Sequence, residues 1–426
     1  MLKLRFRPLI PFRFSRAPLW LALTLAAAAT ATSPPVTQAQ LNLGQYEDEA
    51  PLRTWNIFGH TTAAQAAMGG TRLAHALDLS ASQSNPALLG RLPRISFALS
   101  GSFQHAQLFR YGPVNTGVLY SSANSSLNTT VLDFGGVAVN YKGWGLAFTV
   151  AVNEIYDRPA ADAAVDFQDQ AQYSFVFMQD GFLRTYNLGI SRRITPRLSV
   201  GLGFNSESGS YTRDTVEIST PSRLTIEDAK SLDFRSRFLN GGLTWDISDR
   251  LILAAAFRTP YSRRADGASQ VRNQTLPAVD IRIEVEAESR FRQPLVLGLG
   301  ANYRLVDRLR LTADASFFNW ATYEADYFGV ERDRSFKNVL VLGAGAEFTP
   351  GFHVLGEDFL LPLRLGLASD PQPVDGVDTS YTYATGGFGL HHRLFHLDAG
   401  GMLGRESGSG ADLKVFRAVV TLGFRL

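Results

Sequence analysis

From about Arg94 to Leu426, the sequence alternates apolar residues with small or polar ones in short runs. Successive side chains of a strand point to opposite faces, so each run has one apolar face and one polar or glycine-rich face. From Leu295 to Leu305 the odd positions are Leu, Leu, Leu, Ala, Tyr and Leu, whereas the even positions are Val, Gly, Gly, Asn and Arg. A soluble sandwich needs apolar volume on its inner face. A membrane barrel instead presents one face to lipid and the other to a lumen.

Fourteen runs of about 10 residues show this pattern, each bounded by residues that favour turns. Their centres are Phe97, Val137, Phe148, Leu188, Val200, Phe238, Leu253, Leu297, Leu311, Leu340, Leu363, Phe388, Leu397 and Val420. Outer-membrane barrels have an even number of antiparallel strands, with short periplasmic turns and longer extracellular loops. The sequence therefore predicts an all-β fold, a 14-stranded antiparallel transmembrane β-barrel with both ends in the periplasm.

The predicted connections alternate in length, as such a barrel requires. Short turns are expected at residues 142–143, 195–196, 248–249, 306–307 and 393–394, with a longer one at 350–358. Long loops are expected at residues 110–130, 157–180, 211–229, 260–290, 321–334, 370–380 and 405–411. Within the fourth of these loops, Asp280 to Arg290 alternates apolar with charged residues, which predicts a strand that projects beyond the bilayer with a solvated charged face.

The first 93 residues do not show this alternation of apolar with small or polar residues. Basic residues precede an apolar stretch from Leu19 to Ala31, and Thr37-Gln38-Ala39 offers small residues for signal cleavage. That stretch is about 13 residues long, short of the ~20 that a membrane-spanning helix needs. Residues 40–93 are rich in Ala, Gly and Ser, and a fourteen-stranded barrel is too wide to be filled by its own side chains. We therefore expect a signal peptide at 1–39, an N-terminal hatch or plug at 40–93 and the barrel at 94–426.

Composition excludes several classes of function. The whole chain has 41 basic and 39 acidic residues, and the five charges of the signal are all basic, which leaves 36 against 39. Nucleic-acid binding would need a basic excess. The chain has no cysteine, so disulfides and thiolate metal sites are excluded. It also lacks phosphate-binding glycine loops and His-Glu-x-x-His. We expect no catalytic residues, no metal site and no cofactor, and predict that the chain is not an enzyme.

Residues near the predicted strand ends leave alternatives open. Three of the seven histidines fall at a short turn near Asp398, and interfacial polar residues are preferred there to a hydrolase site because no nucleophile-like serine accompanies them. Aromatic residues also lie at other strand ends, namely Phe257, Tyr261, Phe317, Phe318 and Trp320. These residues fit either interfacial girdles or core packing. Arginines beside Tyr261 fit either the phosphates of lipopolysaccharide or a solvated loop: Arg258, Arg263 and Arg264.

The stretch from Ala63 to Phe103 resembles the N-terminal hatch and first strand of the FadL/TodX family, outer-membrane transporters of long-chain fatty acids and aromatic hydrocarbons. That family carries a glycine pair, a run of small residues and Asn-Pro-Ala just before the barrel; the matching residues are Gly69, Gly70, Asn85, Pro86 and Ala87. Pro294 to Trp320 and Leu361 to Pro373 are similar to parts of the family's C-terminal half. Because proline restricts the backbone, the Asn-Pro-Ala turn is expected to anchor the hatch, against the inward glycines Gly201, Gly203, Gly298 and Gly300.

The resemblance implies passive uptake of small hydrophobic molecules, of the fatty-acid or hydrocarbon class, across the outer membrane of a Gram-negative-type bacterium. The expected partners are that hydrophobic ligand, outer-membrane lipid and lipopolysaccharide, and the barrel-assembly machinery, with no nucleic acid. The family's long apolar third loop is here short and polar. The most apolar outer loop is the second, which supplies the expected ligand-binding residues: Phe167, Tyr173, Phe175, Phe177, Met178 and Phe182.

Two other functions remain open at this point. A related barrel serves as a secretion-system component that carries cargo proteins, so docking of exported proteins at the outer loops is the alternative, and a surface hydrolase is a further one. In the FadL/TodX family a kink in the third strand opens the barrel sideways. The corresponding strand here, Trp144 to Ile155, contains Gly145 but no proline, so the sequence predicts no position for a kink.

Overall fold

A computed structural model describes residues 59–75, 78–107, 119–122, 126–167, 170–219, 223–275, 279–328, 330–331, 335–373, 378–408 and 414–426. Among these, no side chains are described for residues 106–107, 119–122, 126–127, 158–167, 170–177, 279, 327 and 330–331. The predicted signal peptide and residues 40–58 of the predicted hatch lie outside the described residues. No helix in the described part of the chain is long and apolar enough to cross a bilayer.

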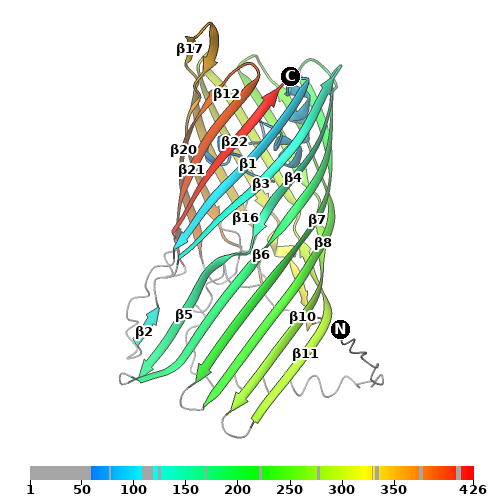
Figure 1. Cartoon of the computed structure of the whole chain (residues 1–426). Helices are drawn as coiled ribbons and strands as arrows, with labels where there is room; N and C mark the ends of the chain where they lie inside the picture. Colours follow the sequence, from blue (N-terminus) through cyan, green and yellow to red (C-terminus); the bar gives the residue numbers. More distant parts are fainter. Residues whose placement is uncertain are drawn as a thin grey trace, which may run out of the picture.

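The described strands form a closed, 14-stranded antiparallel barrel, as predicted (Figure 1). Closure is made by β1 (Ile95–Gln107) and β22 (Lys414–Arg425), which pair from Ser96 opposite Arg425 to Gln107 opposite Lys414. An open edge in lipid would leave backbone groups unpaired, at a cost of several kcal/mol each. This pairing is therefore what allows the wall to lie in a membrane.

The remaining wall strands follow in chain order, and each contains the strand centre predicted for it. Uninterrupted strands are β3 (Ser126–Tyr141), β4 (Trp144–Ile155), β6 (Gln170–Arg193), β7 (Leu198–Ser219), β8 (Leu224–Asp246), β16 (Val339–Phe348), β19 (Leu363–Pro371), β20 (Ser380–His391) and β21 (Phe395–Ser407). Three wall positions are strands with a break: β9 (Leu251–Arg258) with β10 (Tyr261–Thr275), β11 (Val279–Gln293) with β12 (Val296–Val306), and β13 (Leu309–Phe318) with η3 (Trp320–Thr322) and β14 (Glu324–Tyr327).

Several predicted loops are in fact strands, so this part of the prediction is wrong. Residues 211–229 and 260–290 belong to the hairpins β7–β8 and β10–β11, which project beyond the rest of the wall (Figure 1). The β-branched residues Thr215, Val216 and Ile218 favour this extended pairing. The expected charged strand from Asp280 to Arg290 is confirmed within β11. Short strands also replace loop or turn: β2 (Leu119–Ser122), β5 (Arg158–Phe167), β15 (Val330–Glu331), β17 (Gly351–Val354) and β18 (Glu357–Leu360).

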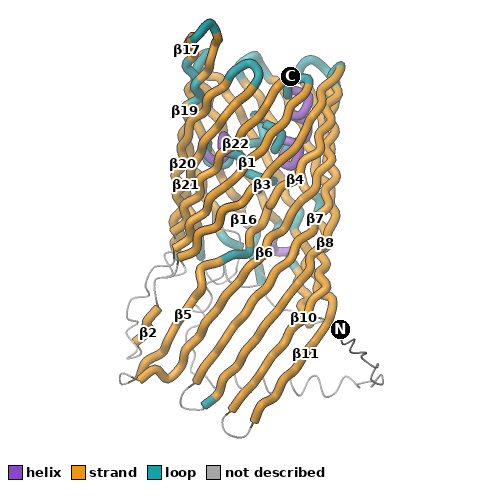
Figure 2. Tube along the Cα trace, viewed as in Figure 1, coloured by secondary structure: helices purple, strands orange, loops and turns teal. Residues whose placement is uncertain are grey.

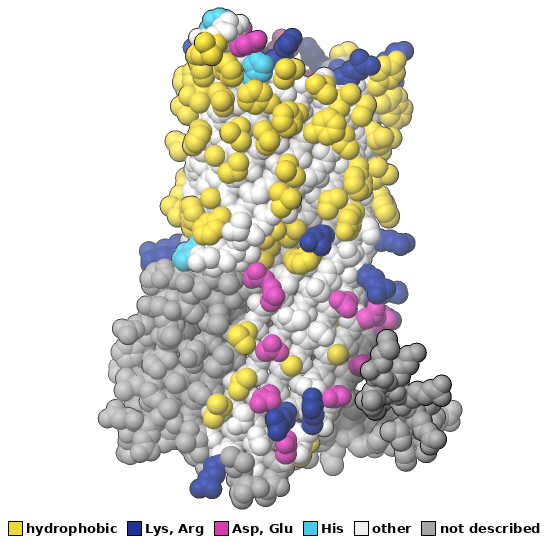
Figure 3. All heavy atoms as spheres, viewed as in Figure 1, with side chains coloured by type: hydrophobic (Ala, Val, Ile, Leu, Met, Phe, Trp, Pro, Cys, Tyr) yellow, Lys and Arg dark blue, Asp and Glu magenta, His cyan; other side chains and the backbone are white. Residues whose placement is uncertain are grey.

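Exposed apolar side chains cover the wall densely, whereas the projecting hairpins carry only scattered ones (Figure 3). We call this surface the apolar belt; it includes Leu99, Leu146, Phe148, Leu188, Leu202, Leu243, Leu253, Leu299, Leu311, Leu342, Leu365, Leu397 and Val420. Exposed aromatic residues lie toward its two margins, with Trp144 and Trp245 near the short turns and Phe257 and Phe317 toward the hairpins. A band of this kind, flanked by aromatic residues, is the surface that lipid covers in outer-membrane barrels.

The residues from Gly59 to Leu92, which we call the N-terminal segment, lie within the barrel near the short turns (Figure 2). The segment contains α3 (Ala63–Ala66), α4 (Ala81–Ser84) and η2 (Pro86–Arg91). These helices are far shorter than a stable isolated helix, and almost all of their side chains are buried. Packing against the wall, rather than helix propensity, therefore holds them in place.

Candidate functional site

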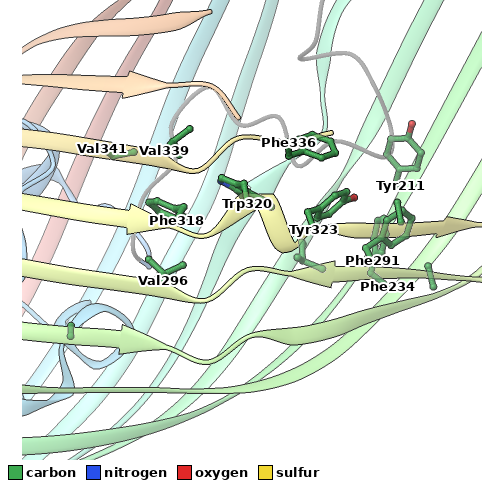
Figure 4. Close-up of a cluster of buried hydrophobic side chains, with 14 of the residues drawn as sticks. Tyr211, Phe234, Phe291, Val296, Phe318, Trp320, Tyr323, Phe336, Val339 and Val341 are labelled. Carbon is green, nitrogen blue, oxygen red and sulfur yellow. The ribbon is translucent and has the colours of Figure 1, made fainter. Parts of the chain in front are cut away.

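Buried apolar side chains gather inside the barrel between the N-terminal segment and the projecting hairpins (Figure 4). We call them the aromatic cluster: Leu183, Tyr211, Leu232, Phe234, Phe291, Val296, Phe318, Trp320, Tyr323, Phe336, Val339 and Val341, with Tyr156 and Phe328 against them. Leu73 and Ala74 of the N-terminal segment join the same cluster. The cluster is therefore continuous with the segment at one side and reaches the hairpins at the other.

Two arms of ring contacts run through the aromatic cluster. In the first, Tyr156 lies 5.3 Å from Tyr211 and 5.5 Å from Phe234, and Phe234 lies 6.0 Å from Phe291, between ring centroids. In the second arm, the successive ring distances are 6.4, 5.7 and 4.9 Å through Phe318, Trp320, Tyr323 and Phe336. These separations fall in the range in which aromatic pairs attract one another. Aromatic side chains thus line the lumen from β4 to β16.

The aromatic residues predicted at strand ends divide between the two faces of the wall. Phe257 and Phe317 face outward, as a girdle requires. Phe318, Trp320 and Tyr261 are buried inside, so core packing is the correct interpretation for them. Phe318 and Trp320 occupy inward positions that continue the regular alternation of β13, whereas the break after Arg258 changes which positions face inward and so buries Tyr261, which the sequence pattern alone did not indicate.

A buried ion cluster lies beside the aromatic cluster, past the apolar belt. Arg263 donates to Glu154 at 2.9 and 3.0 Å and to Glu207 at 3.2 Å. Burial alone would lower the pKa of the Arg263 guanidinium, but attraction to Glu154 and Glu207 raises this pKa well above its usual value. Arg258 is buried nearby as well. The expectation that Arg258 and Arg263 face lipopolysaccharide or solvent is therefore wrong; only Arg264 points outward.

A small cavity of about 30 Å³ separates this ion cluster from the N-terminal segment. Its lining residues are Gly59, Gln83, Asn153, Glu154, Asn205, Glu207, Phe238 and Arg258. Pockets that hold small organic ligands usually measure roughly 300–1,000 Å³. This cavity, as it stands, is therefore too small to hold such a ligand.

The glycine pair of the predicted hatch lies against β16 and β19. Gly69 has φ +65° and Gly70 has φ +76°, a left-handed conformation that L side chains rarely adopt. A Cβ added to Gly69 would lie 2.3 Å from the Leu367 carbonyl oxygen and 2.5 Å from that of Ala344. The Gly69 amide donates to Thr385 Oγ1 at 2.9 Å. Only glycine permits this approach of the segment to the wall.

The Asn-Pro-Ala turn lies against β7 and β8. Asn85 Nδ2 donates to the carbonyl oxygens of Leu73 and Leu243, at 2.8 and 3.3 Å, while Asn85 Oδ1 accepts from the Ala87 amide at 3.2 Å. A Cβ on Gly201 would lie 2.4 Å from Ala87 N and from Pro86 C. The other predicted glycines differ in their neighbours: Gly298 and Gly300 face Leu73, whereas Gly203 faces asparagine side chains of the wall.

Side-chain bonds also connect the N-terminal segment to several strands. Asp314 of β13 accepts from the backbone amides of Arg72 and Leu73, at 2.6 and 3.0 Å. Asn240 of β8 donates to the carbonyl oxygens of Ser82 and Gln83. These polar residues were not singled out in the sequence; the signal that could have found them is the recurrence of Asn, Asp and Thr on the inward face of successive strands.

Of the three histidines near Asp398, His391 belongs to a buried ion network. Asp398 accepts from Arg364 at 2.5 Å and pairs with His391 at 2.9 Å, and Arg364 also donates to Glu347 at 2.8 Å. His396 is buried, whereas His392 lies closer to solvent. His391, Asp398, Arg364 and Glu347 are therefore held by one another rather than arranged around a serine. In the described residues, no group of three or more His, Asp or Glu is placed to hold a metal ion.

The predicted ligand-binding residues of the second outer loop fall on β5 and β6. Met178 is exposed, and Phe182 lies beneath the Arg184 guanidinium, 4.1 Å from it. The side chains of Phe167, Tyr173, Phe175 and Phe177 lie outside those that the structure describes. Met178 and Phe182 do not belong to the aromatic cluster. A ligand-gathering role for these residues stays a prediction.

The pairing of β3 with β4 covers only part of β3. Their ladder ends where Phe134 pairs with Ala151, although β3 continues along β1 as far as Ser126. The β4–β6 register shifts between Val152 and Glu154, which is a β-bulge. Tyr156 of the aromatic cluster follows directly. The strand for which the sequence predicted no kink position therefore carries an irregularity, at Asn153.

Solved outer-membrane proteins share this fold. A Pseudomonas aeruginosa FadL homologue superposes with a TM-score of 0.64 at 14% identity, covering 87% of this chain and 99% of that chain. The Pseudomonas putida toluene transporter TodX also gives 0.64 at 14% identity, covering 88% and 100%. The Ralstonia pickettii toluene transporter TbuX gives 0.62 at 13% identity, covering 87% and 99%. Comparison with curated proteins gives no match.

The closed fourteen-stranded wall with its inner N-terminal segment thus defines an outer-membrane barrel with the FadL fold, as the resemblance predicted. The matching family model is BamG, which covers residues 57–359, more than half of the sequence. The chain belongs to the BamG family.

We predict that the ion cluster stabilises the hairpin end of the barrel only as a complete unit. Arg263→Met should lower the free energy of unfolding by about 3–5 kcal/mol, because it leaves two buried carboxylates without their partner. Adding Glu154→Gln and Glu207→Gln should recover most of that loss. Unfolding is followed by heat-modifiable gel mobility in detergent. Arg264→Met, one residue away on the outer face, is the control; equal losses for Arg263→Met and Arg264→Met would contradict the buried cluster.

Proposed function

We propose that this barrel carries small hydrophobic molecules, of the fatty-acid or hydrocarbon class, passively across the outer membrane of a Gram-negative-type bacterium. The observation that carries the proposal is the aromatic cluster inside the lumen. An apolar solute crosses a polar, phosphate-bearing leaflet poorly, and buried aromatic side chains offer it an apolar path. Two solved proteins of the same fold are toluene transporters, which supports this class of ligand.

The N-terminal segment acts in this proposal as a hatch that closes the short-turn end. Its close backbone contacts at Gly69 and Gly201 support that role. The irregularity at Asn153 supports a release path between β3 and β4, because Tyr156 links that position to the aromatic cluster. A ligand would move from the hairpin end into the cluster and leave sideways into the bilayer, while the hatch prevents leakage of ions.

Docking of a protein partner is the second candidate, and a free strand edge favours it. β11 pairs with β10 along its whole length, but on the other side only Arg290 to Arg292 pair with β14. In the described residues, the edge from Val279 to Ser289 has no partner strand. Exposed edges of this kind accept an added strand from another chain. The family name BamG points to a barrel-assembly context for such a partner.

Closure by the hatch predicts a change in ion conductance. Gly201→Ala with Gly366→Ala should displace the segment, because the new Cβ atoms would lie within 2.4 Å of segment backbone atoms. We expect the purified variant to conduct ions in planar bilayers while the wild type stays nearly closed, and deletion of residues 45–85 should do the same. Gly135→Ala with Gly401→Ala is the matched control, since those positions have ordinary contacts. Unchanged conductance in both variants would refute the hatch.

Transport through the aromatic cluster predicts slower uptake when one ring becomes polar. Phe234→Asn should reduce uptake of radiolabelled toluene or oleate by cells roughly tenfold, because a buried amide without a partner costs about 1–3 kcal/mol. Phe352→Asn, on the exposed hairpin near the short turns, should leave uptake unchanged. Phe175→Asp with Phe177→Asp tests the outer patch in the same assay. Wild-type uptake no faster than that of cells lacking the protein would exclude transport and leave docking as the function.

A further inference from the structure

Outward arginines form a row across the strands where the hairpins leave the apolar belt. The cross-strand register runs from Arg184 on β6 to Ser208 on β7, then to Arg235 on β8, Arg264 on β10 and Arg290 on β11. We call these four arginines the arginine row. Their inward neighbours Leu183, Phe234, Arg263, Ala265 and Phe291 are buried. The arginine side chains therefore share the outer face of the sheet.

The arginine row places like charges directly opposite one another. Residues in direct register on neighbouring strands have Cβ atoms roughly 4.5–5.5 Å apart, and like charges at that distance destabilise a sheet. The side chains of Arg235, Arg264 and Arg290 are 76%, 67% and 59% exposed, so burial does not hold them there. A bound anion over the row would offset the repulsion among these three arginines and so stabilise the arrangement.

Most acidic residues near the arginine row lie on the side away from the belt, although Asp326 of β14 lies in register with Arg290. The next outward row contains Asp233, Asp266 and Glu288, again in direct register. Arg235 lies 3.3 Å from Asp266, and Arg290 lies 2.8 Å from Glu288, but exposed pairs of this kind contribute little. The charges are therefore sorted along the barrel axis, with a basic layer nearer the belt and an acidic layer beyond it.

The belt side of the arginine row carries further basic and hydroxyl groups. Arg237 lies two residues closer to the belt on β8, opposite Ser206, and the next outward residue is Leu239 of the belt margin. In the described part of the chain, Arg184 and Arg237 form no ion pair with an acidic side chain. On β7, the hydroxyls of Ser206 and Ser208 lie between the arginines of β6 and β8. Basic side chains thus gather at the margin of the apolar belt, and acidic ones lie farther out (Figure 3).

We propose that the arginine row binds the phosphate groups of an anionic glycolipid of the lipid A type in the outer leaflet. Guanidinium groups bind phosphate through paired, charge-assisted hydrogen bonds. The row spans four strand steps, roughly 20 Å at about 4.8 Å each, which gives room for more than one phosphate. The acidic layer keeps the phosphates at the belt margin and offers carboxylates to bridging divalent cations. The proposal rests on membrane insertion and is independent of transport.

The test measures binding of bisphosphorylated lipid A to the intact protein in detergent. Arg235→Gln, Arg264→Gln and Arg290→Gln together should weaken binding at least tenfold. A triple control, Arg250→Gln, Arg308→Gln and Arg393→Gln, removes the same charge from exposed positions at the short turns and should change binding less than twofold. Dephosphorylated lipid A and inorganic phosphate should bind the wild type at least tenfold more weakly than lipid A.

Two results would overturn the proposal. One is equal binding of lipid A by the wild type and the row variant; the other is binding of phosphatidylglycerol as tight as that of lipid A, which would indicate a general anionic surface. Melting without lipid checks that the row variant folds, and it should melt at the same temperature as the wild type or higher, because like-charge repulsion is removed. If the triple variant fails to insert, Arg264→Gln alone should still weaken binding about threefold, and an unchanged affinity would count against the row.

Discussion

Backbone pairing around a closed wall is the constraint on which the rest of this structure depends. In lipid every peptide group of the wall needs a partner, so the strands must close on themselves, as β1 and β22 do. In a closed wall, strand geometry points each side chain either toward the lipid or toward the lumen. The apolar belt, the aromatic cluster and the arginine row depend on which residues occupy those two faces. A register shift of one residue would move every side chain of a strand to the opposite face.

The lumen shows how this constraint extends to the N-terminal segment. A closed wall of fourteen strands is too wide for its own side chains to fill. Here small residues of the segment meet glycines of the wall, as at Gly69 and Gly201, so that backbone approaches backbone. Buried polar groups of the wall then find partners in the segment, as Asp314 and Asn240 do. Segment and wall thus form one packed interior, and the aromatic cluster continues it toward the hairpins.

The sequence predicted the wall well because alternation is a local signal. All fourteen strand centres lie in wall strands, and the charged strand from Asp280 to Arg290 was found by the same pattern. The length of the hairpins was missed, because strands beyond the bilayer have polar residues on both faces and resemble loops. The inward side of Arg263 was missed for another reason. Arg258 and Tyr261 would lie on opposite faces of an unbroken strand, but both face inward. The break at Thr259-Pro260 therefore changes which positions face the lumen. No pattern of residue types fixes that change.

The candidate site was harder to predict than the fold, because it depends on which strands the interior brings together. Rings such as Tyr156 and Phe291 are far apart in the sequence and meet only through the wall. The central claim, that the N-terminal segment packs against the inner face of the wall, can be tested by cross-linking. The cysteine-free chain allows clean disulfide pairs, and a Cβ on Gly189 would lie 3.2 Å from Ser82 Cβ, near the spacing of a disulfide.

The measurement is thiol titration of Ser82→Cys with Gly189→Cys after mild oxidation of the folded protein. Packing of the N-terminal segment against the wall predicts a disulfide within one chain for this pair. It predicts two free thiols for Ser82→Cys with Leu188→Cys, because Leu188 faces outward on the same strand. Free thiols in both pairs, or a disulfide in the second pair alone, would contradict the arrangement.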